Sequence, residues 1–323
     1  MRPIEPIAIE DIRSARERIA DAILRTPLVP LAADVPGGEI WLKLENLQPI
    51  GSFKLRGAAN AMRLAAPESL RGGVVTASAG NMAQGVAWNA RRMGVRCTVI
   101  VPEHAPATKL AAIERLGATI VKLPFDRWWQ TLVDHGHPDG AGFFVHPVSD
   151  PAVIAGNGTI GLEILEDLPD VDAVLVPYGG GGLSCGIAMA LSGSGSPAKT
   201  FACEVETAAP LTASLAAGHP VETAYAPSFV DGIGARTLLA EMWPLASTVL
   251  AGSLVVSIAQ VRSAVRLLIE RARVVAEGAG ATPLAAALAA KGGRGKIVCV
   301  ISGGNIDREN LAEILRDPTS AAP

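Results

Sequence analysis

Charged and aromatic residues are both scarce in this chain of 323 residues, at 18% and 4% of the sequence. The formal net charge is −3, and no basic patch or aromatic stacking motif is visible, so the composition argues against a nucleic-acid partner. Long apolar runs are absent as well, so we expect no membrane-spanning helix. Residues 1–24 carry acidic side chains and no apolar core, which does not predict a signal peptide.

Cysteine is also rare, and its four occurrences are scattered without a Cys-x-x-Cys pair. This spacing argues against a metal cluster. Most of the cysteines lie in apolar or Gly-rich stretches, where buried free thiols are common. They are Cys97, Cys185, Cys203 and Cys299. A reducing compartment suits such thiols, so we expect a cytoplasmic enzyme, with a binding protein of the same size as the alternative.

What the chain has in abundance is hydrophobic residues, 49% of the total, which is enough for one large or two medium domains. Their spacing alternates between the two periods typical of strands and helices. Strands are predicted at 39–46, 72–78, 95–102, 118–124, 171–178, 199–206 and 296–302. Helices are predicted at 9–24, 54–64, 82–92, 107–116, 154–168 and 255–272. This alternation predicts parallel sheets covered by helices on both faces.

The alternation is interrupted over residues 126–149, which we interpret as the return from one domain to another. The predicted fold class is therefore α/β, with two open, twisted, mostly parallel sheets. We expect a large domain formed by residues 1–70 and 148–323. A smaller α/β domain, residues 71–147, is expected to be inserted within it.

Four consecutive glycines follow a predicted strand in the stretch LVPYGGGGLSCG. Glycine amides without Cβ atoms can surround an anion, and the start of the next helix adds a partial positive charge. A phosphate would suit this loop. The alternative is a tight turn between strand and helix, although one or two glycines would be enough for that.

Two other predicted strands end in small polar residues. In TASAGNMAQG (76–85), Ser78, Gly80 and Asn81 lie where a carboxylate could bind at the strand ends, or they simply cap the next helix. In CVISGGNID (299–307), Ser302 ends a strand before two glycines. Its hydroxyl can bond a ligand, or it is an ordinary turn serine.

Lys54 lies between apolar residues in GSFKLRG (51–57), at a predicted helix start. Burial of a lysine lowers the pKa of its amine, which makes the amine nucleophilic. A surface lysine whose stem alone is buried is the alternative.

Taken together and in this order, GSFKLRGA, SAGN-AQG, GGGGL and SGGN resemble the pyridoxal-phosphate (PLP) enzymes of fold type II. The resemblance is to their threonine dehydratase and serine racemase branch, and it extends from RTPL (26–29) to SGGNID. It implies a fold similar to that of the tryptophan synthase β chain, PLP as the cofactor and an amino acid as the substrate. A homodimer is also implied.

The resemblance implies a role for each matching position. Lys54 matches the Schiff-base lysine, and Phe53 the residue packed against the pyridine ring. Asn81 matches the partner of the cofactor's 3-hydroxyl, Ser302 that of the ring nitrogen, and Glu277 an acidic residue near the cofactor's far side. The implied phosphate cup is Gly179, Gly180, Gly181, Gly182 and Leu183. The implied substrate-carboxylate loop is Ser78, Ala79, Gly80, Asn81 and Met82.

A neutral serine at the ring nitrogen need not protonate the ring, which favours a reaction whose charge leaves promptly with a β-substituent. The resemblance thus implies a lyase of amino-acid catabolism. Such a dehydratase, or ammonia-lyase, converts threonine, serine or phenylserine to a 2-oxo acid and ammonia. The alternatives are an amino-acid racemase, a β-replacement enzyme, or a non-catalytic protein that binds PLP or an amino acid. The β-replacement enzymes typically have Gly-Thr-Gly-Gly-Thr where this chain has four glycines.

The substrate loop departs from the family's usual Ser-Ser-Gly-Asn-His at two positions, Ala79 and Met82. The second serine is the opposite-face base in the racemases, so Ala79 argues against racemisation. Both replacements are less polar, which suggests room for a larger apolar β-substituent such as the phenyl of phenylserine.

A further departure concerns metal. The racemase-like members bind a divalent cation with a Glu and an Asp; here Glu204 and Glu206 are kept, but Pro210 stands near the position of the Asp. We therefore predict no such metal site. The sequence also ends soon after Ser302, so we expect no C-terminal regulatory domain and no feedback inhibition by isoleucine.

Overall fold

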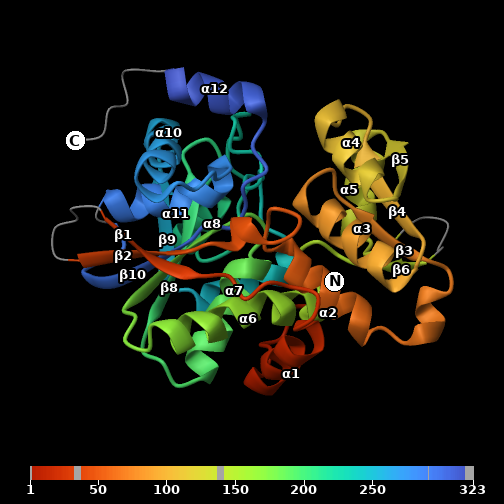
Figure 1. The fold of residues 1–323 in the computed structure, drawn as a ribbon, viewed down its shortest axis with the longest axis horizontal. Helices are drawn as coiled ribbons and strands as arrows, with labels where there is room; N and C mark the ends of the chain where they lie inside the picture. Colours follow the sequence, from red (N-terminus) through yellow and green to blue (C-terminus); the bar gives the residue numbers. More distant parts are fainter. Residues whose placement is uncertain (1, 33–37, 137–141, 290, 317–323) are drawn as a thin grey trace.

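The strands of the protein form two separate sheets, as a computed structural model covering residues 2–32, 38–136, 142–289 and 291–316 shows (Figure 1). The larger sheet has six strands, in the spatial order β1 (Leu28–Leu31), β2 (Gly38–Lys43), β10 (Gly295–Val300), β7 (Ala173–Pro177), β8 (Lys199–Val205) and β9 (Gly252–Val256). The smaller has four, in the order β5 (Thr119–Leu123), β4 (Cys97–Pro102), β3 (Val74–Ala77) and β6 (Phe143–Phe144). Only β1 pairs antiparallel. The predicted α/β class, with two mostly parallel sheets, is confirmed.

Helices connect these strands and cover the sheets. In chain order they are α1 (Ile9–Ile19), α2 (Lys54–Leu64), α3 (Asn81–Met93), α4 (Ala107–Arg115), α5 (Phe125–Val133), α6 (Pro151–Asp167), α7 (Gly182–Gly193), α8 (Pro210–Ala217), α9 (Trp243–Val249), α10 (Ile258–Leu267), α11 (Gly278–Leu288) and α12 (Arg308–Arg316). Short helical turns are η1 (Glu45–Leu47), η2 (Pro67–Leu70), η3 (Ala240–Met242) and η4 (Leu268–Ala272).

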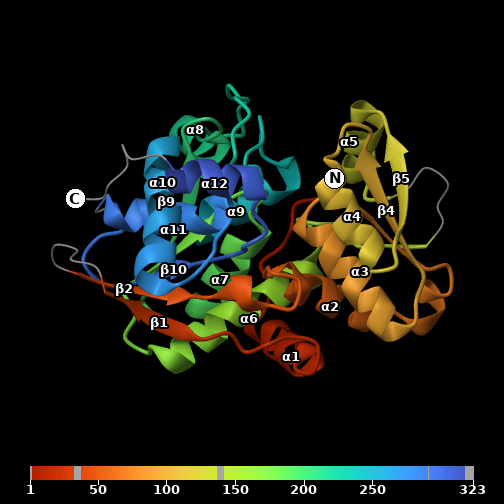
Figure 2. The same cartoon turned by 45° about the horizontal axis from the view of Figure 1, so that its top comes forward.

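The central strand β7 shows why the larger sheet needs helices on both sides. All five of its residues are buried, and alternate residues face opposite sides. Leu175 packs in a core with α10 and α11, whereas Val174 and Val176 pack in another core with α6 and α7. The two sets of helices lie on opposite sides of the sheet (Figures 1 and 2).

The smaller sheet is built in the same way within residues 74–144. Val74 and Val99 face a core that contains α3 and α4, whereas Val75 and Ile100 face α5. Figure 1 shows this sheet with its helices to one side of the larger sheet. The arrangement supports our proposal that 71–147 is a small domain inserted between two parts of a large one.

Two predicted segments need correction. Residues 126–149 are not only a return between domains, because α5 and the two-residue strand β6 lie there, both in the smaller layer. The predicted helix 255–272 begins late, because Val255 and Val256 belong to edge strand β9. α10 then starts at a capping box in which Ser257 and Gln260 bond each other's backbone amides.

α2 is held in place by a buried network of charges. Arg56, on α2, pairs with Glu45 of η1 at 2.8 Å and with Glu163 of α6 at 2.7 Å. Glu163 also pairs with Lys43 of β2 at 2.6 Å. The charges balance, and the carboxylates satisfy the guanidinium, so the network fixes α2 against the large sheet and α6.

No helix among the described residues has both the length and the apolar character needed to cross a membrane.

Replacing Arg56 with Met should destabilise the protein strongly. Arg56 is 0% exposed, and its loss leaves two buried carboxylates without their main partner. We expect the free energy of unfolding to fall by about 3–5 kcal/mol, measured by urea denaturation. Arg25→Met is the matched control, because Arg25 is 50% exposed and pairs with Asp167 on the surface; we expect about 1 kcal/mol or less there. Equal losses in the two variants would contradict the argument.

Candidate active site

The turn before Lys54 is pinned to the end of β10. The Phe53 amide donates to the Ser302 carbonyl at 3.0 Å, and Ser52 forms an isolated β-bridge with Gly303. Gly51 makes this turn with a φ of +72°, a conformation that favours glycine. Lys54 then opens α2. Residues far apart in the sequence, 53–54 and 302, are thereby brought together.

The Lys54 amine is half-buried at this junction. Its Nζ donates to the Pro147 carbonyl at 2.7 Å and lies 5.2 Å from the centre of the Phe53 ring. Burial lowers the pKa of Lys54 from 10.5 to about 8, and the nearby Glu277 carboxylate opposes this shift. A meaningful fraction of the amine is therefore unprotonated near neutral pH, as a nucleophile or base requires.

The four glycines follow β7 and lead into α7, which Gly182 opens, and close packing excludes a side chain at Gly180 and Gly182. A Cβ atom on Gly180 would lie 2.4 Å from Val148, and one on Gly182 would lie 2.8 Å from the Val148 carbonyl. Gly181, the N-cap of α7, has a φ of +93°. The first amides of α7, including that of the buried Leu183, lack acceptors within the helix. This is an anion-binding loop in form, and a phosphate suits it.

The stretch Ser78–Met82 joins β3 to α3. The Ser78 hydroxyl accepts from the Gly80 amide at 3.2 Å, Gly80 is the N-cap of α3, and Asn81 is its first residue. Ala79 packs at the edge of the small-domain core. Met82 is only 2% exposed and packs inside that core. Its side chain is therefore unavailable to a substrate, and only its backbone amide can line the loop.

Asn81 bridges the smaller and larger layers. Its Nδ2 donates to Glu277 Oε1 at 2.8 Å, and its Oδ1 accepts from Asn305 Nδ2 at 2.8 Å. The pKa of Glu277 is raised to about 7, chiefly by burial and next by the Asp231 carboxylate. The hydrogen bond from Asn81 acts in the opposite direction and lowers it. Predicted residues Asn81 and Glu277 are thus in direct contact.

Ser302 follows β10 and is 2% exposed. Its hydroxyl forms no hydrogen bond within the described part of the chain, so it can serve a ligand. The neighbouring parallel strands β10 and β7 end at the same sheet edge, which brings Ser302 close to the start of the glycine loop. Crevices at such carboxyl ends are where ligands bind in α/β sheets.

The residues that meet here fit the predicted PLP. The amine of Lys54 can bond the aldehyde, the glycine loop offers helix-start amides for the phosphate, and Ser302 offers a hydroxyl for the ring nitrogen. Phe53 lies beside the amine, where a ring could pack. The groups therefore suit the cofactor in charge and in hydrogen-bonding character.

Three contributors to the site were missed by the sequence reasoning. Pro147 contributes only its backbone carbonyl, and Val148 contributes bulk against the glycines. No sequence signal marks either contribution. Asn305, by contrast, stands inside the motif SGGNID and gave a signal that was not used.

Both glutamates considered as metal ligands act as helix caps. The Glu204 carboxylate accepts from the amides of Leu211 and Thr212, each at 2.8 Å, at the start of α8. Glu206 accepts from the Ile258 amide at 2.9 Å, at the start of α10. Among the described residues no group of three His, Cys, Asp or Glu is placed to hold a metal ion.

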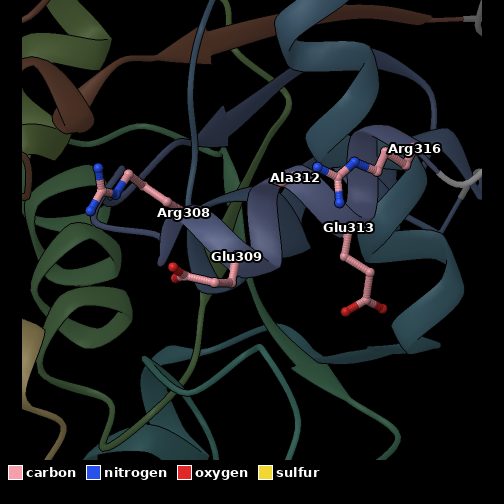
Figure 3. Close-up of a pocket in the computed structure, with 5 residues that line it drawn as sticks. All are labelled: Arg308, Glu309, Ala312, Glu313 and Arg316. Atoms are coloured by element: carbon pink, nitrogen blue, oxygen red, sulfur yellow. The ribbon is translucent and has the colours of Figure 1, made fainter.

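A surface hollow elsewhere is not a competing site. It lies over α12 and is lined by Arg308, Glu309, Ala312, Glu313 and Arg316 (Figure 3). These residues come from one helix, and the arginine and glutamate side chains extend away from it. None of them is a predicted site residue.

Comparison with known proteins agrees with this geometry. Residues 19–303 match the family model described as pyridoxal-phosphate dependent enzyme. The chain is 40% identical to an L-threonine ammonia-lyase of Thermotoga maritima, over 96% of this chain and 78% of that protein. It is 38% identical to a catabolic L-threonine dehydratase of Escherichia coli, over 96% of both. Among solved structures it resembles a maize serine racemase with a TM-score of 0.89 and 30% identity, over 96% of this chain and 97% of the racemase.

We expect the Lys54 amine to titrate near pH 8 in the full-length chain free of cofactor, because burial lowers its pKa to about 8. The measurement is the pH dependence of amine acetylation, followed peptide by peptide by mass spectrometry. Glu277→Gln should move the midpoint lower still, since it removes the carboxylate that stabilises the ammonium. Exposed Lys199 is the internal reference. A midpoint at the ordinary value of about 10.4 would show that the amine is not desolvated.

Proposed function

The chain belongs to the pyridoxal-phosphate-dependent enzymes of fold type II, and on that premise we propose that it is an ammonia-lyase acting on threonine. The reaction eliminates water from the β-hydroxy amino acid, and hydrolysis of the released enamine gives a 2-oxo acid and ammonia. The observation that carries the proposal is the meeting of Lys54, the glycine loop and Ser302 at one sheet edge. A basic amine, an anion cradle and a free hydroxyl are what this chemistry needs.

Threonine is placed first among the β-hydroxy amino acids for two reasons. The relatives at 38–40% identity are named for threonine. In addition, the Met82 side chain lies in the small-domain core and does not line a pocket for a phenyl group. Serine and phenylserine are second candidates, and for phenylserine only Ala79 remains as a reason.

The substrate's two charged groups find partners on both sides of the site. We propose that the carboxylate binds at the start of α3, where the first amides of the helix lack acceptors within it and the helix dipole favours an anion. Asn81, held by Glu277 and Asn305, orients that helix start against the large domain. The carboxylate is then fixed relative to Lys54 by both domains.

Lys54 supplies the proton chemistry. PLP, when bound, supplies an electron sink that acidifies the substrate's Cα–H bond. The Lys54 Nζ, with its pKa lowered to about 8, can accept that proton near neutral pH. The Pro147 carbonyl, 2.7 Å from Nζ, orients the amine and accepts one of its protons in a hydrogen bond.

Racemisation is the second candidate activity, because a serine racemase is among the structures similar to this chain. Ala79 carries no group that can move a proton at the face opposite Lys54. We therefore expect L-serine recovered from a long incubation to stay L, measured by chiral chromatography. Formation of D-serine at a rate comparable to ammonia release would instead assign a racemase.

A homodimer and a cytoplasmic location stay predictions.

Lys54→Ala should abolish release of 2-oxo acid from threonine, by at least about 10³-fold in kcat/KM, because it removes both the cofactor's anchor and the base. The assay measures ammonia and 2-oxo acid from threonine, serine, phenylserine and hydroxyaspartate under the same conditions. We expect the wild-type kcat/KM to be highest with threonine.

Lys199→Ala is the control for this variant, because Lys199 is an exposed lysine at the start of β8. It should retain wild-type rates. If wild type binds PLP yet releases no 2-oxo acid from any of the four substrates, the protein is a binder and the lyase proposal is wrong.

A further inference from the structure

Ser149 lies at a polar junction between the two domains that the proposed reaction does not use. Its hydroxyl donates to Glu241 Oε1 at 2.9 Å and lies 3.1 Å from Nε2 of His135. Glu241 belongs to η3 in the large domain, and His135 follows α5 in the small one. Ser149 and Glu241 are 2% and 3% exposed, so their hydrogen bonds are shielded from water.

His146 makes the segment of residues 146–149 rigid. Its ring stacks on His135 with centroids 4.1 Å apart. Its Nδ1 accepts from the amides of Val148 at 3.2 Å and Ser149 at 2.8 Å, so the ring proton is on Nε2. Burial, and then the neighbouring His135, lowers the pKa of His146 to about 3, which keeps the ring neutral and Nδ1 an acceptor. The chain from 146 to 149 therefore has one defined conformation.

That short segment touches both halves of the candidate active site. The Pro147 carbonyl accepts the hydrogen bond from Lys54, and Val148 lies against Gly180 and Gly182 of the anion loop. A shift of this segment would therefore move the acceptor of the lysine and the wall of the loop at once. The contacts of Ser149 with Glu241 and His135 hold the end of this segment.

We propose that His135, Ser149 and Glu241 form an interdomain latch that positions the Pro147 carbonyl against the Lys54 amine and keeps water away from it. The latch rests on the role proposed above for Lys54. The residues of the latch are positioning residues, since they act through the segment 146–149. The other ionisable groups that act on Lys54 are Glu277, before α11, and the neutral His146.

Opening the latch should hydrate Lys54. In Ser149→Ala the hydroxyl that contacts both Glu241 and His135 is missing, and only the longer His135–Glu241 contact at 3.4 Å remains between those two residues. Segment 146–149 then loses its hydrogen bond to Glu241 and can move away from the amine, which lets water reach it. We expect the acetylation midpoint of Lys54, in the full-length chain free of cofactor, to rise from about 8 toward the ordinary 10.5, by about one pH unit or more. Glu241→Ala should give the same rise. Glu241→Gln should stay near wild type, because its amide oxygen still accepts from Ser149.

Ser253→Ala is the matched control. Ser253 donates to the buried Glu204 carboxylate at 2.8 Å, as Ser149 does to Glu241, but it lies on edge strand β9 of the large sheet. The control removes the same kind of bond without touching segment 146–149, so the Lys54 midpoint should not move.

An unchanged midpoint in both Ser149→Ala and Glu241→Ala overturns the latch, and so does an equal rise in Ser253→Ala. Far-UV circular dichroism checks that each variant folds. If Ser149→Ala does not fold, His135→Phe decides, because it keeps a ring against His146 but removes the Nε2 contact; no rise there also overturns the latch.

The labelling assay needs no lyase activity, so the two proposals fail separately. If wild type makes no 2-oxo acid but the latch variants raise the Lys54 midpoint, the proposed function is wrong and the latch stands. If wild type is an active lyase and the midpoint never moves, the latch is wrong and the function stands.

Discussion

The position of α2 depends on Arg56, and the proposed base, Lys54, is carried by α2. A guanidinium that is fully buried is tolerated only with paired carboxylates, and these come from η1 and α6. The helix cannot slide or rotate without separating those charges. Lys54 stands two residues before Arg56 on the same helix, so the network that orients Arg56 also fixes where the amine emerges. Close contact with α6 reinforces this, since a Cβ on Gly156 would lie 2.6 Å from the Arg56 carbonyl.

The second constraint is that the site is assembled from elements of both sheets. Lys54, the glycine loop and Ser302 belong to the large sheet's edge, while the loop from Ser78 to Met82 belongs to the small sheet. Direct polar contacts join the two at Asn81–Glu277, and again where His135 meets Ser149 and Glu241. The loop that we propose for the substrate carboxylate is thus oriented by hydrogen bonds from the domain that carries the base.

The sequence was a good guide wherever a feature follows from local pattern. The succession of strand-like and helix-like apolar segments predicted the parallel strands. The run of four glycines marked a turn where Gly180 and Gly182 have no space for a side chain. Met82 shows the limit of reasoning from a motif. The resemblance of the motif implies a place for Met82 in the substrate loop, yet Met82, Val86 and Ala90 share one helical face, and that face is buried. The helical period would have placed the side chain in the core.

Other features were beyond the sequence for physical reasons. A backbone carbonyl such as that of Pro147 is present at every residue, so its role depends on folded geometry alone. The strand β6 has two residues and cannot show a period. Glu204 and Glu206 were weighed as metal ligands because of residue type, but both carboxylates accept helix amides, and only the fold shows which use is made of them.

The environment of Lys54 and Glu277 brings two very different groups close to the same proton affinity. Burial disfavours both charges, so it lowers the pKa of the lysine to about 8 and raises that of the glutamic acid to about 7. The two pKa values therefore differ by far less than they do in water. A base with such a pKa can take up a proton and release it within one catalytic cycle at neutral pH, because neither its protonated nor its unprotonated form is strongly favoured. The side chains that exclude water from these two groups therefore help to determine the proton affinity of the proposed base.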